Sequence, residues 1–536
     1  MNRIKNNFHY DTHNKILISD VQNIMNKYIN ITDRTNKYIN INFFREAFKH
    51  ISIVENEIES YERLEFLGDA VFHLIVTHYI YNRYNEEGSG FLTRIRICIE
   101  KSESLIDLTK KLKLNKFIQY DRNSSTQLKY NDNIYEDIFE SFVGAFYLNF
   151  GYEQCYHLIV GILETEKDFS TLIYYDDNFK DLLLRYFHKM KWGNPIYLKK
   201  PNNVRYVTDP DGNILGESSG QTKKIAEQNA SKEALKKLNI IINDEIDYDW
   251  ADKIDIESYE SIESNDNDKK IIPIRNVKNK LITCKIIENI LKKYNVNTCC
   301  SIDNITLYTE GFTHPSYLNR KLSYVFADSN IDNTVPLQEK QYDRLQFIGG
   351  AIIHLVIAEF LFEQYPLQNE GFLTRIRSRI DNKEILYLLA RACGIHKYAL
   401  LSTRVELIGG RKNTNIIVCC LSGFVGAMYL DIGYHTTKNF IVSLIKTELP
   451  IDEIVETETN YKELLISLYY KNNWGTPTYE IIKEYGPDHS KQFMMCIRDC
   501  KQNIIAEASG NSKKKAQKKV AKKAYFRLQN YLNSKK

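Results

Sequence analysis

The stretch YERLEFLGDAVFHLI, residues 61–75, returns 281 residues later as YDRLQFIGGAIIHLV, residues 342–356. Its apolar positions survive almost unchanged, and they recur at the spacing of a helix in both copies. Two acidic positions do not survive, because Glu65 becomes Gln346 and Asp69 becomes Gly350. The sequence therefore keeps a helical scaffold twice and keeps these carboxylates once.

Further pairs of segments show that the whole chain is a duplication. GFLTRIR occurs at 90 and 371, SFVGAFYLNFGY at 141 matches GFVGAMYLDIGY at 423, and WGNPIY at 192 matches WGTPTY at 474. These pairs keep an offset of 281–282, whereas ESSGQTKK at 217 matches EASGNSKK at 507 with an offset of 290. Eight residues have thus been gained or lost between 197 and 217.

Each copy divides into two parts. Residues 20–170 and 275–450 carry apolar residues at helical spacing with few strand signals, which predicts two all-helical domains. Residues 176–240 and 458–532 each contain an amphipathic run, strand-like pieces and a Lys/Ala-rich helix, an α-β-β-β-α order. Between the copies, residues 241–272 are acidic and predict a solvated linker. The predicted fold class is a multidomain α and α+β protein.

Composition sets limits on the compartment. A chain of 536 residues with 43% hydrophobic and 12% aromatic residues can form several packed cores. Its ten cysteines include no CxxC pair, and the start MNRIKNNFHY lacks the apolar run of a signal peptide. We expect an intracellular protein of the cytoplasm or nucleus that is not secreted. No run approaches the roughly 18–20 apolar residues of a membrane span, so no membrane partner is expected.

The first copy contains two acidic groups on predicted helices. Glu62, Glu65 and Asp69 stand at i, i+3 and i+7, on one helix face, while apolar residues occupy the other faces. Asp137 and Glu140 form a second pair at i, i+3. A solvated stripe is the ordinary interpretation of such acids, but the apolar surroundings favour a cleft. Two such helices facing each other would form an oxygen site suited to Mg²⁺ or Mn²⁺.

These residues carry a family resemblance. ERLEFLGDAV, followed about seventy residues later by DIFESFVGAFYL, resembles the ribonuclease III signature. GQTKKIAEQNASKEAL, PTYEIIKEYGPDHSKQF and GNSKKKAQKKVAKKA resemble the double-stranded RNA-binding domain. The tandem arrangement is similar to that of Drosha and Dicer, except that each nuclease domain here is followed by its own RNA-binding domain. The resemblance implies an endoribonuclease that cleaves double-stranded RNA.

The resemblance also assigns roles to residues of the first copy. It implies metal-assisted hydrolysis of a phosphodiester with Mg²⁺, or Mn²⁺ in its place, and needs no His or Cys nucleophile. His50 and His314, which correspond across the copies, are expected to be hydrogen-bonded core or near-core histidines. The metal-holding carboxylates would be Glu65, Asp69, Asp137 and Glu140, and Glu62 would support them as a fifth catalytic residue.

The second copy lacks this constellation. Neutral side chains cannot balance two divalent cations, so the second site is predicted to be inactive. A different metal held by Cys419 and Cys420 is the alternative, but adjacent residues point apart on a helix. The positions aligned with the five acids are Asp343, Gln346, Gly350, Cys419 and Ser422.

The retained scaffold suggests a role in pairing. Ribonuclease III domains work as dimers, and the resemblance places Phe66 and Phe347 where a phenylalanine enters a socket on the partner domain. We expect an intramolecular pseudo-dimer with one working centre, while a homodimer that pairs two first-copy domains stays open. A non-cleaving protein that binds or sequesters double-stranded RNA is the competing function.

The RNA-binding modules differ in strength. Residues 460–536 contain 16 Lys/Arg and 6 Asp/Glu, a net charge of +10. The second module contains the loop GPDH, residues 486–489, which matches the family's GPxH pattern. The first module has YLKKPNNVRY in its place, so it is expected to bind RNA weakly or to serve in packing. By resemblance, the RNA-binding residues are Glu463, His489, Ser512, Lys513 and Lys514 in the second module and Thr222, Lys223 and Lys224 in the first.

Overall fold

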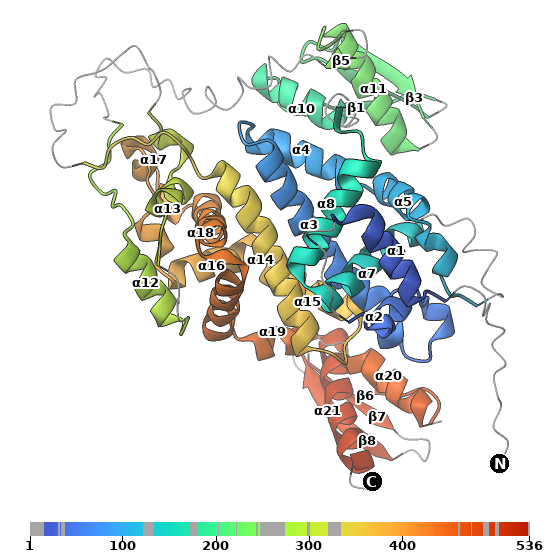
Figure 1. Ribbon diagram of the computed structural model, residues 1–536. Helices are drawn as coiled ribbons and strands as arrows, with labels where there is room; N and C mark the ends of the chain where they lie inside the picture. Colours follow the sequence, from blue (N-terminus) through green and yellow to red (C-terminus); the bar gives the residue numbers. More distant parts are fainter. Residues whose placement is uncertain are drawn as a thin grey trace. The chain divides into compact units, whose positions relative to one another are not determined.

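Figure 1 shows the computed structural model, which divides into two compact units, Met1–Glu448 and Leu449–Lys536. The described residues are 15–30, 33, 38–121, 133–170, 179–201, 203–220, 222–242, 245–246, 274–296, 301–319, 334–458, 461–472, 474–485, 492–498 and 503–533.

The first nuclease domain is built on two packed helices. The long helix α3 (Glu62–Arg83) contains the first acidic group, and α7 (Asn133–Phe150) contains the second. These two helices pack directly against each other. Around them lie α1 (Ile18–Tyr28), α2 (Ile41–Glu46), α4 (Ser89–Glu100), α5 (Ser102–Lys111) and α8 (Tyr152–Glu166), together with 3-10 turns at Ile51–Ile53, Glu57–Glu59 and Leu114–Phe117.

The second nuclease domain repeats this plan. Its central helices are α14 (Asp343–Gln364) and α18 (Thr414–Glu448), and Gly433 interrupts α18 with φ of 81° at the point where Gly151 separates α7 from α8. The other helices are α12 (Cys284–Lys293), α13 (Ile305–Phe312), α15 (Glu370–Ile380), α16 (Lys383–Ala392) and α17 (Thr403–Leu407), with 3-10 turns at Pro315–Tyr317, Ile395–Lys397 and Gly410–Lys412.

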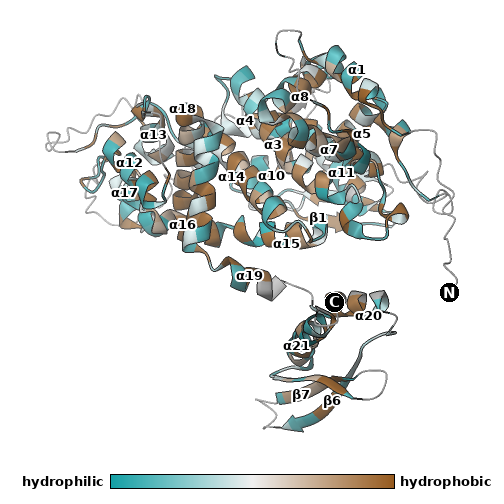
Figure 2. Cartoon of the chain, turned by 60° about the horizontal axis from the view of Figure 1, so that its bottom comes forward, coloured by the Kyte–Doolittle hydropathy of each residue, from teal (hydrophilic) through white to brown (hydrophobic). Residues whose placement is uncertain are grey.

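Among the residues that the structure describes, two helices are long and apolar enough to span a membrane by length and composition alone. They are α14 and α18, so the expectation that no segment reaches this length is wrong. Their apolar windows are 78% and 67% buried inside the protein. Figure 2 shows α18 as largely hydrophobic along its length. This burial is what the central helices of a globular domain show, since they pack against neighbours on most sides.

Both RNA-binding modules have the predicted α-β-β-β-α order. The first contains α10 (Phe179–Lys189), β1 (Tyr197–Lys199), β2 (Val204–Thr208), β3 (Ile214–Ser219) and α11 (Lys223–Lys237). The second contains α20 (Tyr461–Lys471), β6 (Thr478–Tyr485), β7 (Gln492–Arg498), β8 (Ile504–Gly510) and α21 (Lys513–Asn533). Each sheet is antiparallel, in the order β1-β2-β3 or β6-β7-β8. The predicted multidomain α and α+β class is thus confirmed.

The eight-residue difference between the modules lies in the first hairpin. Counted from the matching Tyr197 and Tyr479, this hairpin runs over 197–208 in the first module and over 479–498 in the second. Strand β1 has three residues, whereas β6 has eight. The predicted acidic linker is described only at its start, in the short strands β4 (Ile241–Ile242) and β5 (Glu245–Ile246). Residues 247–273 lie outside the described residues. Helix α19 (Ile451–Glu458) precedes the second module.

Candidate active site and RNA-binding surface

The five predicted acids of the first copy come together on α3 and α7. Glu62, Glu65 and Asp69 lie on α3, Asp137 and Glu140 lie on α7, and all five side chains are half-buried. The two helices pack so closely that a Cβ on Gly68 would lie 1.8 Å from the backbone oxygen of Glu140, which puts the acids of the two helices near one another. The structure therefore assembles one carboxylate cluster from residues about seventy positions apart.

Burial and mutual repulsion raise most of the pKa values in this cluster. The pKa of Glu65 rises to about 9, first because burial disfavours the charged form and then because Asp137 and other acids are near. The pKa of Asp137 rises to about 6, and that of Glu140 rises well above its usual range, in both cases mainly through burial. Burial also raises the pKa of Glu62. Such a cluster stores repulsion that a cation would relieve.

Two residues outside the predicted set belong to this cluster. Tyr61 donates a hydrogen bond from its hydroxyl to Asp137 Oδ2 at 3.0 Å, which orients that carboxylate. Glu370, at the start of α15 in the second nuclease domain, adds repulsion that raises the pKa of both Glu62 and Glu65. The duplication offered a signal for Tyr61, which is retained as Tyr342, but nothing in the sequence placed Glu370 near the first copy.

Asp69 has different partners from the other acids. Its Oδ2 accepts a hydrogen bond from Arg377 Nη1 at 3.2 Å and lies 4.0 Å from His354 Nε2. Burial works against the charged form of Asp69, but His354 and Arg377 together hold its pKa below the usual range. Both partners come from the second nuclease domain, on α15 and α14. Sequence analysis missed them, although the GFLTRIR repeat contains Arg377.

The donor set fits a hard divalent cation. Among the described residues, no three His, Cys, Asp or Glu side chains converge as a ready-made metal site. Carboxylate oxygens without thiol or imidazole ligands are the set that Mg²⁺ prefers. Glu65, Asp69, Asp137 and Glu140 are the residues that could hold such an ion.

The corresponding place in the second copy is chemically neutral. Tyr342 contacts Cys419, as Tyr61 contacts Asp137, but burial raises the pKa of Cys419 to about 11, so its thiol stays protonated. Asp343, the retained acid, accepts a hydrogen bond from Gln341 at 2.6 Å. Gly350 stands where the first copy has Asp69. A Cβ built on Gly350 meets no atom within 4 Å, so no protein atom fills the place where such a side chain would begin.

The two nuclease domains meet through reciprocal contacts. Helices α3 and α14 pack side by side, with α15 against α3 and α4 against α14. Phe66 and Phe347 are 3% and 8% exposed, and each ring is covered by an arginine of the other domain. Arg63 donates to the carbonyl oxygens of Phe362 and Tyr365, each at 3.1 Å, and Arg344 repeats this at Tyr81 and Tyr84, each at 2.8 Å. Each guanidinium thus caps the carboxyl end of the other domain's long helix.

One pair of equivalent interface positions has diverged. Glu359 accepts hydrogen bonds from the hydroxyl of Tyr147 in the first domain and of Tyr434 in its own, and Lys438 Nζ lies 3.3 Å away. At the equivalent place, His78 Nδ1 lies 2.9 Å from the Tyr429 hydroxyl. Burial lowers the pKa of His78 to about 4, so this side is neutral. The interface is therefore not chemically symmetric.

His50 and His314 have structural roles, as predicted. In each, Nδ1 accepts a hydrogen bond from the backbone N–H two residues on, Ser52 or Ser316, at 3.1 Å. Burial lowers the pKa of both and brings that of His314 to about 4. Neither lies among the carboxylates, and each caps a short 3-10 turn.

In the second RNA-binding module the lysines gather at the start of α21. Ser512 caps this helix by accepting from Lys515 N at 3.2 Å, and Lys513 and Lys514 are exposed in its first turn. The Lys513 ammonium lies 3.4 Å from Glu484 and 5.4 Å from the centroid of the Phe493 ring. Glu463 lies on α20, but its side chain and the predicted loop residue His489 are outside the described residues.

The first module has the same helix start with less charge. Thr222 caps α11 by accepting from Ile225 N at 3.3 Å, and Lys223 is exposed. Lys223 lies 3.8 Å from Glu227, a surface ion pair of small energy. The side chain of Lys224 lies outside the described residues. The paired lysine positions thus begin the last helix of both modules.

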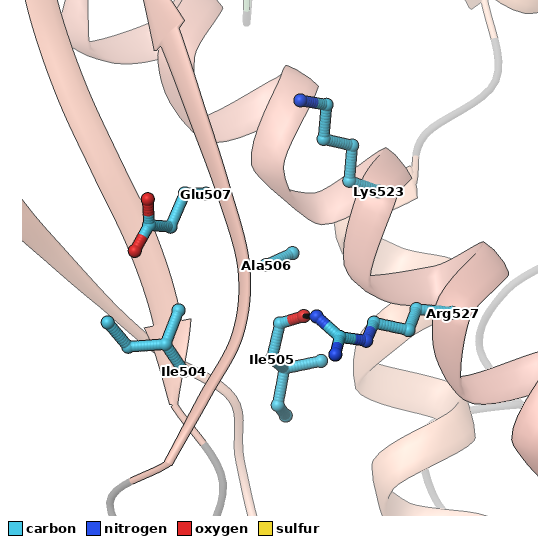
Figure 3. Close-up of a pocket in the computed structure, with 6 residues that line it drawn as sticks. All are labelled: Ile504, Ile505, Ala506, Glu507, Lys523 and Arg527. Atoms are coloured by element: carbon cyan, nitrogen blue, oxygen red, sulfur yellow. Dashed lines mark hydrogen bonds between the residues drawn. The ribbon is translucent and has the colours of Figure 1, made fainter.

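A shallow pocket in the second module lies apart from these lysines. It opens between β8 and the carboxyl-terminal half of α21, as Figure 3 shows. Arg527 donates to the carbonyl oxygen of Ile505 there at 2.9 Å. Lys523 and Arg527 lie ten or more residues along α21 from Lys513, so the pocket is not part of the predicted RNA-binding surface. Its lining residues are Ile504, Ile505, Ala506, Glu507, Lys523 and Arg527.

The chain has two helical domains in tandem, and each is followed by an α-β-β-β-α module. The first helical domain contains a carboxylate cluster. This combination defines a class of nuclease that acts on double-stranded RNA. The Ribonuclease-III-like family matches residues 40–165 and 304–449, and the double-stranded RNA binding motif matches 179–238 and 461–528. The chain belongs to the ribonuclease III family. It is an endoribonuclease, a hydrolase, with double-stranded RNA as its partner.

Individual proteins are similar over different lengths. A protein named "Probable ribonuclease 3" from Acanthamoeba polyphaga mimivirus is 45% identical over 93% of both chains. Ribonuclease 3 of Bdellovibrio bacteriovorus is 35% identical over 40% of this chain and 89% of its own. The solved nuclease domain of ribonuclease III from Campylobacter jejuni is 22% identical, with a TM-score of 0.25, over 31% of this chain and 99% of that one. Enzymes of this family generally depend on divalent metal.

Proposed function

We propose that this endoribonuclease has one working centre, in the first nuclease domain, and uses Mg²⁺, or Mn²⁺ in its place. The observation that carries the proposal is the contrast between the copies. Four buried or half-buried carboxylates meet in the first, whereas amide, hydrogen, thiol and hydroxyl replace them in the second. Neutral groups cannot balance divalent cations. The second domain is then the pairing partner of the first.

In this mechanism the chain's own residues prepare the site. Glu65, Asp69, Asp137 and Glu140 would hold the ion, and Glu62 would support them from the same face of α3. When bound, the metal lowers the pKa of a water molecule and neutralises charge on the phosphate. Tyr61 holds Asp137 in one orientation through its hydrogen bond. The lysines of the second module would hold the duplex by its phosphates while the cluster meets one strand.

We further propose that the two nuclease domains pair within one chain. The reciprocal insertion of Arg63 and Arg344 and the divergence of His78 from Glu359 support this arrangement over a dimer of first-copy domains. A tether also raises the effective concentration of the partner. The ten cysteines of the chain include no CxxC pair, which supports an intracellular, reducing compartment, and we propose this as the site of action.

The test is a comparison of Glu140→Gln with Ser422→Ala at the equivalent position. Glu140→Gln should abolish cleavage of an end-labelled duplex in Mg²⁺ while leaving duplex binding intact, because it removes a carboxylate charge from the cluster and leaves the lysines of the second module unchanged. Ser422→Ala and Cys419→Ala should be nearly silent. If Glu140→Gln cleaved at the wild-type rate, the assignment of the site would be wrong, and a protein that only binds double-stranded RNA would be favoured.

A further inference from the structure

Two equivalent arginines cross the interface between the nuclease domains in opposite directions. Arg377 on α15 and Arg96 on α4 hold the same place in the two GFLTRIR segments. The guanidinium carbon of Arg377 lies 4.7 Å from the centroid of the Phe66 ring, and that of Arg96 lies 4.9 Å from the centroid of the Phe347 ring. Their packing against the partner domain is therefore matched.

The residue three positions after each phenylalanine differs. Three positions after Phe66 lies Asp69, whose Oδ2 accepts a hydrogen bond from Arg377 Nη1 at 3.2 Å. After Phe347 comes Gly350, which has no side chain to offer. Arg377 thus contacts a carboxylate of the working centre across the interface, whereas Arg96 has no carboxylate at the equivalent position.

Arg96 shows what the arginine does without that carboxylate. It turns to its own domain, with Nη1 3.4 Å from His73 Nε2 and Nε 3.6 Å from Glu100 Oε2. Its Nε is buried and has no hydrogen-bond partner among the described residues. Arg96 therefore makes its polar contacts within its own domain, whereas Arg377 makes its contact with Asp69 across the interface.

A second contact supports the carboxylate of Asp69 on the same atom. His354 Nε2 lies 4.0 Å from Oδ2, and His354 Nδ1 lies 2.8 Å from Asp381 Oδ2, which fixes the imidazole ring. Both contacts from the second domain thus reach Oδ2. This leaves Oδ1 as the oxygen that can turn toward the cluster on α7, where Asp69 interacts electrostatically with Glu140.

We propose that Arg377, supplied by the degenerate nuclease domain, is a positioning residue of the working centre. It holds the carboxylate of Asp69, which would be one of the metal ligands, by Oδ2, and the first domain is incomplete without it. This inference rests on the proposed function, in which Asp69 is a metal ligand. Carboxylates that ligate metals are themselves held by hydrogen bonds, and losing such a partner costs roughly 10–100-fold in metal affinity or activity.

The test measures Mn²⁺ binding to the full chain by calorimetry, without RNA. Arg377→Gln should weaken Mn²⁺ binding about 10–100-fold. Arg96→Gln is the matched control: it removes the same packing on a phenylalanine, should lower the melting temperature comparably, and should leave Mn²⁺ affinity unchanged. Arg377→Lys should recover part of the affinity, because it restores the charge but not the planar fork of donors.

A double-mutant cycle separates positioning from general damage. If Arg377 acts through Asp69, then Arg377→Gln should cause no further loss of Mn²⁺ affinity in an Asp69→Asn background. Equal losses from Arg377→Gln and Arg96→Gln, or an additive loss in the cycle, would overturn the proposal. Should Arg377→Gln not fold, Arg377→Lys against Arg96→Lys gives the same comparison. If Glu140→Gln binds Mn²⁺ as wild type does, the proposed function itself fails, which is a different result.

Discussion

The backbone oxygen of Glu140 lies where a side chain at Gly68 would begin, 1.8 Å from the position of an ideal Cβ. Helices α3 and α7 can therefore bring their acids together only if residue 68 is glycine. The second copy repeats the contact, with Gly349 and the oxygen of Ser422 at 1.8 Å. Both copies thus have this close helix contact, although only the first has the carboxylates.

This contact predicts a large effect of one methyl group. Gly68→Ala should lower the free energy of unfolding by about 3 kcal/mol or more, since backbone atoms must move apart, and should abolish cleavage. Gly350→Ala is the matched control on the equivalent face, where a Cβ meets nothing within 4 Å. It should leave stability unchanged or raise it slightly, because alanine favours helix. Thermal unfolding of both variants checks this, and equal destabilisation would contradict the helix contact.

The carboxylate pKa values predict how pH affects the metal-free enzyme. Glu65 has a pKa of about 9 in the folded state and about 4.3 in an unfolded chain, so the folded state binds the proton more tightly. Its destabilising contribution is absent below about pH 4 and grows as pH rises toward 9. The melting temperature in EDTA should therefore fall over this range more in wild type than in Glu65→Gln.

Mg²⁺ should reverse this fall of the melting temperature with rising pH. The gain in melting temperature on adding Mg²⁺ should increase from pH 5 to 9, because the ion binds the deprotonated cluster. The Glu65→Gln variant should gain less at high pH. A Mg²⁺ effect that is constant with pH in wild type would mean that these carboxylates are not the ligands.

The lysine pairs predict a ranking of the RNA-binding modules. Lys513→Ala with Lys514→Ala should weaken duplex binding and flatten its salt dependence, since each lost phosphate contact reduces the slope by about one. The same changes at Lys223 and Lys224 should matter less, because the first hairpin of that module is shorter. Binding measured from 50 to 200 mM salt compares the two, and equal losses would contradict the ranking.

One working centre predicts nicks. Each centre cuts one strand, so a chain whose domains pair within itself should nick a duplex at each docking and should need a second binding event to break it. Nicked intermediates should accumulate early on a gel that resolves both strands, at a rate per enzyme independent of protein concentration. Double-strand products without a nicked phase, from a chain that sediments as a monomer, would exclude a single centre.

The internal duplication, the helix pair and the carboxylates could be predicted from the sequence, because these features depend on local spacing within one copy. It was insufficient for contacts that depend on how the copies face each other. Arg377, His354 and Glu370 lie about 300 residues from the acids they influence, and no periodicity relates them.

Arg96 packs on the Phe347 ring across the interface but makes its polar contacts within its own domain, with Nη1 3.4 Å from His73 Nε2 and Nε 3.6 Å from Glu100 Oε2. A Cβ built on Gly350 meets no protein atom within 4 Å. An aspartate introduced by Gly350→Asp would stand to Arg96 as Asp69 stands to Arg377. It should therefore bind Arg96 without creating a second cut, because positions 419 and 422 hold a thiol and a hydroxyl.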